Sequence, residues 1–414
     1  MKYAIVIFGG AADQPLEELQ DKTPLQVARC PTLKRMGQTG RFGQLTALPE
    51  PIEPTPDAAV LSMLGYDPLT HYPGNAPLRA VGLGIAVQPG DWVMNLSLLS
   101  APGGLVGGFD RAVLPPAEAR ALLAGLVEQL DLGGATVHPT DDGLHLMVDP
   151  ASLGRDWAEL STAPPSVLPG RTIRRMLPTG GKAGERLQSL IAQSEVFLQG
   201  HEMNQARAEM GEALVTHLWP WGQGQVASLP GWADGHGKSA VLLSQDPAVR
   251  GVAKSACLGW MAPDPGAAVK GEDERARHDP EGDLVRLGCA AVEALDAVDV
   301  VVIDAHEAAQ AGLDGHVANK IDAIELIDQH VLKPIELAIT ARGEDYRLLA
   351  TPLYATLTDE RRCESLPVPF VVTGYKMQGV VPRPVTEPAA EHADLRVDYG
   401  HELMEFFLKS GVRG

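Results

Sequence analysis

The chain has 414 residues and carries 53 acidic against 34 basic side chains, a formal net charge of −19 with histidine neutral. This negative excess argues against a protein that binds nucleic acid by neutralising phosphates, and against docking on an anionic membrane surface. Hydrophobic residues make up 45% and aromatic residues 5% of the chain, as in a globular protein whose core consists mainly of Ala, Val and Leu.

No segment predicts secretion or a membrane span. Residues 1–7 form a short apolar run without the basic region and cleavage site of a signal peptide, and no apolar stretch approaches the ~20 residues that span a bilayer. The cysteines lie far apart and form no CxxC pair, so they predict neither a zinc site nor a disulfide framework. We therefore expect a cytoplasmic protein. The cysteines are Cys30, Cys257, Cys289 and Cys363.

Short, continuous apolar runs alternate with longer stretches of helical periodicity, which predicts an α/β protein with a largely parallel sheet. The expected strands are Tyr3–Phe8, Lys238–Ser244, Val298–Ile303, Tyr346–Ala350 and Val368–Thr373. The clearest helices are Gly282–Leu295 and Asn319–Leu337, where apolar residues recur at spacings of three and four.

The region from about residue 103 to residue 184 is rich in glycine and proline and differs from the rest of the chain. We expect a smaller α/β domain inserted at residues 106–184, and a core domain made of residues 1–105 and 185–414. The charged run Lys270–Asp283 predicts a solvated loop that leads into a helix.

Seven motifs, in order along the chain, resemble those of one enzyme family. They are the opening MKYAIVIFGGAADQPLEELQDKTPL, Leu61–Pro68, Gly74–Ile85, His201–Arg207 (HEMNQAR), Trp219–Gly224 (WPWGQG), Leu366–Gly374 and Gly400–Leu408. The chain thus resembles the archaeal-type 2,3-bisphosphoglycerate-independent phosphoglycerate mutases of the alkaline-phosphatase superfamily. The resemblance implies a large alkaline-phosphatase-like core sheet flanked by helices. It also implies two divalent metals, such as Mn, Mg or Zn, and a serine nucleophile that together interconvert 3- and 2-phosphoglycerate.

The residues on which that chemistry depends differ in this chain. At the positions that the resemblance assigns to metal ligands and to the nucleophile stand Gly9, Pro56, Ala309, Leu313, Thr351, Pro352 and Cys363. This set offers a hard divalent cation neither carboxylate nor imidazole, and Pro56 has no hydroxyl to attack phosphorus. We expect these positions to converge on one pocket whose wall is unusually apolar for the family.

The positions that the resemblance assigns to substrate binding have changed as well. Asn75 replaces an arginine, Ser166 and Val167 replace a His-Asp pair, and Val93 replaces a basic residue. A phosphate site without arginine lacks its bidentate donors. The resemblance therefore implies a homologue that has lost the two-metal site and the nucleophile, and that binds a metabolite or regulates a partner without catalysis. We expect no cofactor, and as partner a small anionic metabolite or another protein.

The alternative is an active metal-dependent mutase, or a related phosphotransfer enzyme, whose ligands have moved. Candidate ligands follow an expected strand end, where α/β folds place their sites. They are Asp304, His306, Asp314 and His316, with Thr55 as a candidate displaced nucleophile. The competing interpretation is that Asp304 caps the turn into a helix and that the histidines are ordinary loop residues.

Asp57 and the His201–Arg207 motif supply the candidate ligand-binding residues. Within the motif, His201, Asn204 and Arg207 recur at near-helical spacing, which suggests a common cluster on one helix. The competing interpretation is that these three side chains hold that helix in place. The sequence leaves both interpretations open.

Overall fold

The computed structural model describes residues 1–110, 113–155, 157–261 and 279–410. The chain forms two compact units by its internal contacts. The core unit comprises Met1–Tyr72 and Ser228–Gly414, and the second unit comprises Pro73–Ala227. Each unit is described by itself below.

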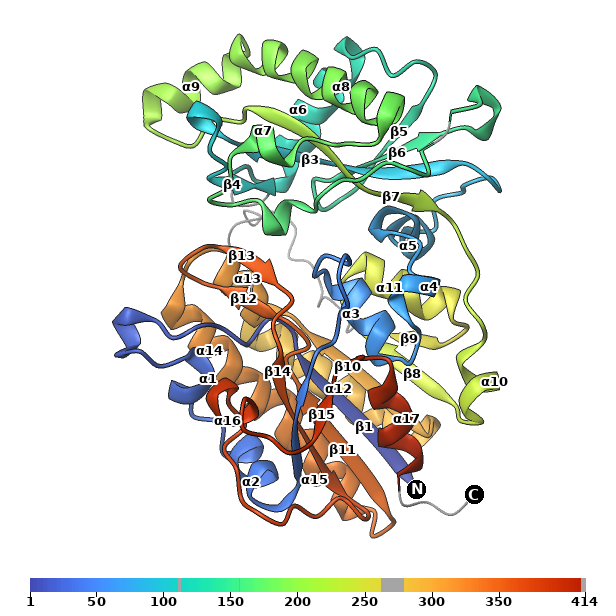
Figure 1. Ribbon diagram of the computed structural model, residues 1–414, viewed down its shortest axis with the longest axis vertical. Coiled ribbons are helices and arrows are strands. Elements are labelled where there is room, and N and C mark those ends of the chain that lie inside the picture. Colours follow the sequence, from blue (N-terminus) through green and yellow to red (C-terminus); the bar gives the residue numbers. More distant parts are fainter. Residues whose placement is uncertain (111–112, 156, 262–278, 411–414) are drawn as a thin grey trace. The chain divides into compact units, whose positions relative to one another are not determined.

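Within its described residues, the core unit is built on an eight-stranded sheet in the order β15-β2-β14-β11-β1-β10-β8-β9. Neighbours from β11 through β1, β10 and β8 to β9 are parallel, whereas β14 is antiparallel to β11 and β2. Figure 1 shows the blue β1 among orange strands from the other end of the chain. The strands, including a separate β12-β13 hairpin, are β1 (Lys2–Phe8), β2 (Arg41–Leu45), β8 (Ala240–Leu243), β9 (Gly259–Met261), β10 (Val300–Ala305), β11 (Tyr346–Thr351), β12 (Ala355–Leu357), β13 (Arg362–Glu364), β14 (Val368–Gly374) and β15 (Arg396–Val397).

Continuous apolar sequence forms the central strands. All of β10 is buried, and β1 is buried from Tyr3 onward, as expected for parallel strands covered on both faces. The predicted strands agree with β1, β8, β10, β11 and β14 to within two residues at either end. The α/β fold class, with a large mixed core sheet flanked by helices and a smaller domain, is confirmed.

Helices flank this sheet, and α12 packs against β8 and β10. The predicted helix Asn319–Leu337 divides in three, because Asp328–Leu332 forms a π-helical turn (η7) between α14 and α15. The helices of the core unit are η1 (Glu17–Leu19), α1 (Pro24–Val27), α2 (Pro31–Thr39), α3 (Pro56–Met63), α4 (Pro68–His71), α10 (Trp232–His236), α11 (Pro247–Ser255), α12 (Pro280–Ala297), α13 (Glu307–Leu313), α14 (Val317–Ile327), α15 (Lys333–Ala341), α16 (Glu387–Ala390) and α17 (Glu402–Lys409).

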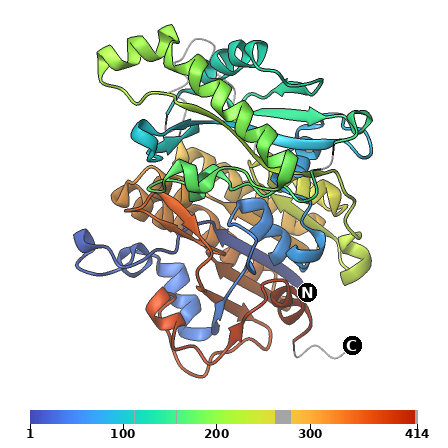
Figure 2. The same ribbon diagram turned by 45° about the horizontal axis from the view of Figure 1, so that its top comes forward.

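The second unit contains an antiparallel sheet in which β3 pairs with β4, β6 and β7, and β5 pairs with β6. The long green helix α8 packs on β7 (Figure 2). The unit extends beyond residues 106–184 on both sides, because β3 and β7 flank that segment and pair with each other. Its elements are α5 (Asn75–Leu83), β3 (Trp92–Ser100), η2 (Pro102–Gly104), β4 (Gly108–Phe109), α6 (Pro116–Gln129), β5 (Thr136–Pro139), β6 (His145–Asp149), η4 (Ala151–Leu153), η5 (Pro165–Val167), α7 (Ile173–Met176), α8 (Gly181–Gln199), α9 (Glu202–Met210) and β7 (His217–Gln225).

In the part of the chain that the structure describes, no helix is both long and apolar enough to cross a bilayer. The predicted charged loop Lys270–Asp283 falls outside the described residues as far as residue 278. From Asp279 the chain is described, and the Asp279 carboxylate accepts the N–H of Gly282 at 3.0 Å. This bond caps the start of α12.

Candidate functional site

The candidate site lies in the core unit, at the edge where the parallel strands β8, β10, β1 and β11 end. Ile7 of β1 is in register with Asp304 of β10 and with Thr351 of β11. The three strand ends therefore bring the segments after Phe8, Ala305 and Thr351 to one edge of the sheet. Open α/β sheets place their ligands at this carboxyl edge.

Several of the positions assigned to metal ligands meet at this edge. The N–H of Gly9 donates to the carbonyl of Ala305 at 2.7 Å, and the N–H of Gly10 donates to the carbonyl of Pro352 at 3.3 Å. Gly10 has a φ of +65°, and a Cβ there would lie 2.5 Å from the Cβ of Ala309. A side chain at residue 10 is thus excluded by both conformation and space. Gly9, Ala309 and Pro352 therefore lie near one another.

The remaining assigned positions also serve the local structure. The Cys363 thiol is buried 3.7 Å from the Thr356 hydroxyl, on the β12-β13 hairpin. The Thr351 hydroxyl donates to the carbonyl of Pro369 at 3.2 Å. Leu313 is the last residue of α13, and Pro56 is the first of α3. The roles that the resemblance assigns to these positions remain predictions.

Asp57 and Thr55 flank Pro56 and share one partner, Tyr72. The Tyr72 hydroxyl donates to the Asp57 carboxylate at 2.9 Å and lies 3.3 Å from the Thr55 hydroxyl. Burial, and then the charge of Asp57, hold the pKa of Tyr72 well above its ordinary value. A displaced nucleophile needs an adjacent base, and a phenol that resists ionisation does not provide one. This contact gives no support to Thr55 as nucleophile.

Asp304, near the end of β10, forms an ion pair with His306, the residue that follows this strand. The Asp304 carboxylate accepts the Ser244 hydroxyl at 2.8 Å and lies 3.7 Å from Nδ1 of His306. Burial opposes protonation of His306, but the Asp304 carboxylate, followed by the charges of Glu307 and Asp246, raises its pKa to about 10. The expectation that Asp304 caps the next helix is wrong, because His306 occupies the N-cap of α13 and no side chain caps it.

The proposed relocated ligands do not form a metal centre. Asp314 accepts the side-chain amide of Gln310 at 3.0 Å, and His316 is an exposed N-cap residue of α14. Within the described ranges, which include all four candidates, no group of three or more His, Cys, Asp or Glu side chains is placed to hold a metal ion. A divalent ion needs such a set to offset its dehydration. The residues present at this edge therefore do not fit the family's two metals.

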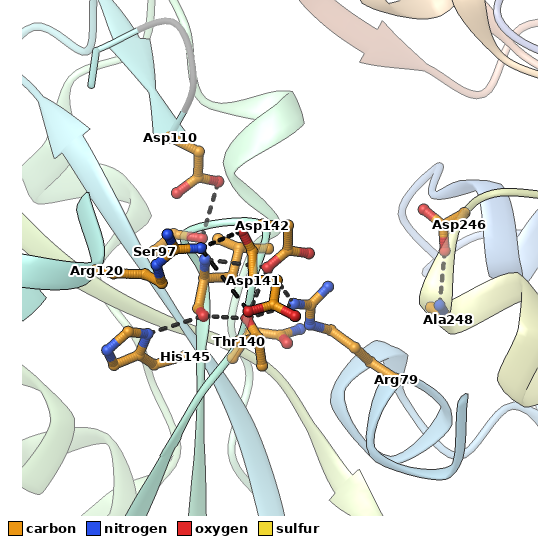
Figure 3. Close-up of polar contacts among 12 residues, drawn as sticks. Arg79, Ser97, Asp110, Arg120, Thr140, Asp141, Asp142, His145, Asp246 and Ala248 are labelled. Atoms are coloured by element: carbon orange, nitrogen blue, oxygen red, sulfur yellow. Dashed lines mark hydrogen bonds and ion pairs between the residues drawn. The ribbon is translucent and has the colours of Figure 1, made fainter. Parts of the chain in front are cut away.

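Carboxylates also lie near this edge, and the expectation of an unusually apolar wall did not include them. Asp246 follows β8 and caps α11 by accepting the N–H groups of Ala248 at 2.7 Å and Val249 at 3.0 Å (Figure 3). The pKa of buried Tyr354 is raised well above its ordinary value, by burial first and then by acidic neighbours. These neighbours are Cys363, Asp304, Asp246 and Asp57. Sequence reasoning missed Asp246 and Tyr354, although an Asp-Pro pair after a strand is a helix-start signal.

In the second unit, the His201–Arg207 motif holds its own helix in place. His201 accepts the N–H of Met203 at 3.2 Å and so caps α9. The Asn204 amide donates to the carbonyls of Leu198 and Val215 at 2.8 and 2.6 Å. Arg207 donates to the carbonyls of Ala213 and Val113, and pairs with Glu212 at 2.9 Å. These contacts favour the structural interpretation of His201, Asn204 and Arg207.

One position assigned to substrate binding, Asn75, lies on the same helix as an arginine that is already paired. Asn95 donates to the Asn75 side chain at 2.7 Å, at the start of α5. On the same helix, buried Arg79 pairs with Asp142 at 2.6 Å and donates to Thr140 at 2.9 Å (Figure 3). Because Asp142 already balances its charge, Arg79 does not substitute for the arginine replaced by Asn75. Val93 and Val167 are buried in apolar clusters, and Ser166 lies on the short turn η5.

Sequence reasoning also missed a half-buried carboxyl in the second unit. Asp110 accepts the Ser97 hydroxyl at 3.0 Å and the N–H of Leu98 at 3.1 Å (Figure 3). Burial raises the pKa of Asp110 to about 7, although both hydrogen bonds oppose the rise. Ser97 in turn accepts the indole N–H of Trp221 at 2.8 Å. This partner set joins residues more than a hundred positions apart, so no local sequence signal predicts it.

Comparisons with known proteins place the chain in a family. The sequence profile of 2,3-bisphosphoglycerate-independent phosphoglycerate mutase matches residues 37–204. The mutase of that name from Methanosarcina mazei is 31% identical to this chain over 372 residues, which cover 90% of each protein. A probable mutase from Geobacter sulfurreducens is 31% identical over 417 residues, which cover 99% of this chain and all of the relative. A protein of solved structure from Pyrococcus horikoshii covers 100% of this chain and 99% of its own, with a TM-score of 0.69 at 19% identity, and so shares the fold. The chain belongs to the 2,3-bisphosphoglycerate-independent phosphoglycerate mutase family.

Proposed function

We propose that this chain is a member of the family that has lost the two-metal chemistry and acts as a binding or regulatory protein. One observation carries the proposal. The positions that the resemblance assigns to the metal ligands and to the nucleophile carry no carboxylate, imidazole or serine hydroxyl: they are Gly9, Pro56, Ala309, Leu313, Thr351, Pro352 and Cys363. Without metal ions and a serine hydroxyl, positioning alone does not reproduce in-line phosphoryl transfer.

The charges at the edge support the same proposal. Asp57, Asp246 and Asp304 all act on the phenol of Tyr354, and the cation paired with Asp304 is His306. A phosphorylated acid brought to these carboxylates would be repelled unless further positive charge accompanied it. The edge therefore suits a protein partner, or a neutral or cationic group, better than a small anionic metabolite.

The test is metal content by elemental analysis, together with a 3-phosphoglycerate mutase assay in added Mn²⁺, Mg²⁺ or Zn²⁺. An active relative of the family serves as the positive control. We expect no stoichiometric metal and no turnover. A Pro56→Ser variant, which restores a hydroxyl without restoring metal ligands, should remain equally inactive.

Two bound metals per chain with turnover would sink the proposal and favour the enzyme with moved ligands. In that case Asp304→Asn and His306→Gln would be the first variants to assay. Loss of turnover in both would assign the moved ligands. Unchanged turnover in both variants would show that the metals bind elsewhere in the chain.

A further inference from the structure

A cavity of about 750 Å³ lies within the second unit, and every residue that lines it belongs to that unit. It opens at the end of the sheet where β3 finishes and β7 begins, near the pair formed by Leu99 and His217. The turn η2 and the helices α7, α8 and α9 form its walls. Its volume is within the range of sites that bind small organic molecules.

The floor of the cavity is apolar. Ile173, Ile191 and Val215 line it, and their side chains are 6%, 3% and 0% exposed. Along α8 the lining residues recur every three or four positions, from Gln188 through Ile191 and Ala192 to Glu195 and Gln199. One face of α8 therefore forms a continuous wall, apolar in the middle.

The rim of the cavity carries two opposite charges that are not paired with each other. Arg174 of α7 is exposed, and its guanidinium makes no hydrogen bond or ion pair with any described residue. Glu195 is 61% exposed and lies 3.7 Å from Nε2 of His217. Burial lowers the pKa of His217, although the charge of Glu195 acts to raise it. The imidazole is therefore neutral at pH 7 and does not balance the charge of Glu195.

We propose that this cavity binds a small zwitterion with an apolar body, either a free amino acid or a short peptide with aliphatic side chains. The ligand's carboxylate meets Arg174, its ammonium group meets Glu195, and its side chains lie on the floor at Ile173 and Ile191. A purely anionic ligand would be repelled by Glu195, and a purely apolar one would gain nothing from either charge. Because every residue used belongs to the second unit, the proposal stands independently of the loss of mutase activity.

The test is isothermal titration calorimetry of the full chain with three probes: leucine, leucyl-leucine, and leucyl-leucine blocked by N-acetyl and C-amide groups. At least one of the first two should bind, and the blocked form should bind about ten-fold or more weakly, because it lacks both charges. A difference in affinity between leucine and leucyl-leucine shows whether a free amino acid or a short peptide fits the cavity better.

Variants with matched controls separate a site from a non-specific effect. Arg174→Gln and Glu195→Gln should each weaken binding about ten-fold, whereas Arg175→Gln and Glu185→Gln, on the same helices but outside the cavity, should not. Ala192→Trp should abolish binding by filling the cavity, and Val196→Trp, on the exposed side of α8, should leave it intact. Circular dichroism of each variant verifies the fold.

Three results would overturn the proposal. The first is that neither leucine nor leucyl-leucine binds at millimolar concentration. The second is that the blocked peptide binds as tightly as the free one. The third is that binding survives both Ala192→Trp and a second cavity-filling variant, Ala208→Trp. None of these results bears on the mutase assay, so the two proposals fail separately.

Discussion

The strand edge of the core unit and the start of α9 in the second unit are both places where the family resemblance predicts function, and they differ in how their polar groups are used. At α9 the family-like residues are present, and His201, Asn204 and Arg207 make hydrogen bonds to the protein backbone. At the strand edge the assigned residues are replaced. The carboxylates that remain there, Asp304 and Asp246, raise the pKa values of His306 and Tyr354. The retained motif therefore makes structural contacts here, whereas the replaced residues stand at the positions to which the resemblance assigns the chemistry.

Buried Lys320 gives the sharpest way to test what holds the core-unit edge together. Its ammonium donates to the Asp13 carboxylate at 2.8 Å and to the carbonyls of Ala12 at 3.1 Å and Thr356 at 2.5 Å. Asp13 also accepts the Thr358 hydroxyl at 2.6 Å. The ammonium thus joins the segment after β1 to the hairpin that carries Cys363.

We expect Lys320→Met to lower the free energy of unfolding of the core unit by about 3–5 kcal/mol, because Asp13 would remain buried without its counter-ion. Urea denaturation measures the loss. Exposed Lys333→Met is the matched control and should change stability by less than about 0.5 kcal/mol. The double variant Asp13→Asn/Lys320→Met should recover part of the loss, and equal stability of both single lysine variants would contradict the argument.

Asn204→Ala tests the other side of the comparison. The Asn204 side chain donates to the Leu198 and Val215 carbonyls and accepts the Val215 N–H at 2.9 Å, so its removal leaves buried backbone groups unsatisfied. We expect the second unit to lose about 2–3 kcal/mol of unfolding free energy in urea denaturation. Exposed Gln205→Ala should cost about 0.5 kcal/mol or less. A stable Asn204→Ala protein would reopen the binding interpretation of the motif.

The strands of the core sheet could be predicted because each is a continuous apolar run, as in β1 and β10. The extent of the second unit could not, because the pairing of β3 with β7 joins segments more than a hundred residues apart. The π-helical turn Asp328–Leu332 was also missed: its sequence continues the helical pattern, and Asp328 accepts the N–H groups of Thr32 and Leu33 from a distant segment. At the candidate site the sequence identified Asp57 but not Tyr72, its hydrogen-bond partner.

The pH dependence of stability separates the two units by its pH range, although stability falls with rising pH in both. In the core unit the pKa of His306 is raised to about 10. Its contribution to the free energy of unfolding is therefore complete below the ordinary pKa of an imidazole, and it is lost as pH rises toward 10. In the second unit the pKa of the Asp110 carboxyl is raised to about 7. The unfolded chain releases this proton near pH 4, so between about pH 4 and pH 7 the native state holds more protons and stability falls as pH rises.

Asp110→Asn should flatten the decline of second-unit stability between about pH 4 and pH 7, because the amide is neutral throughout. Urea midpoints measured across this range for the wild type and the variant test the effect. Asp141→Asn removes a fully exposed carboxyl of the same unit and should leave the wild-type profile unchanged. A carboxyl carbon titration of Asp110 by NMR gives the pKa directly, and an ordinary value there would show that the hydrogen bonds from Ser97 and Leu98 stabilise the carboxylate as much as burial opposes it.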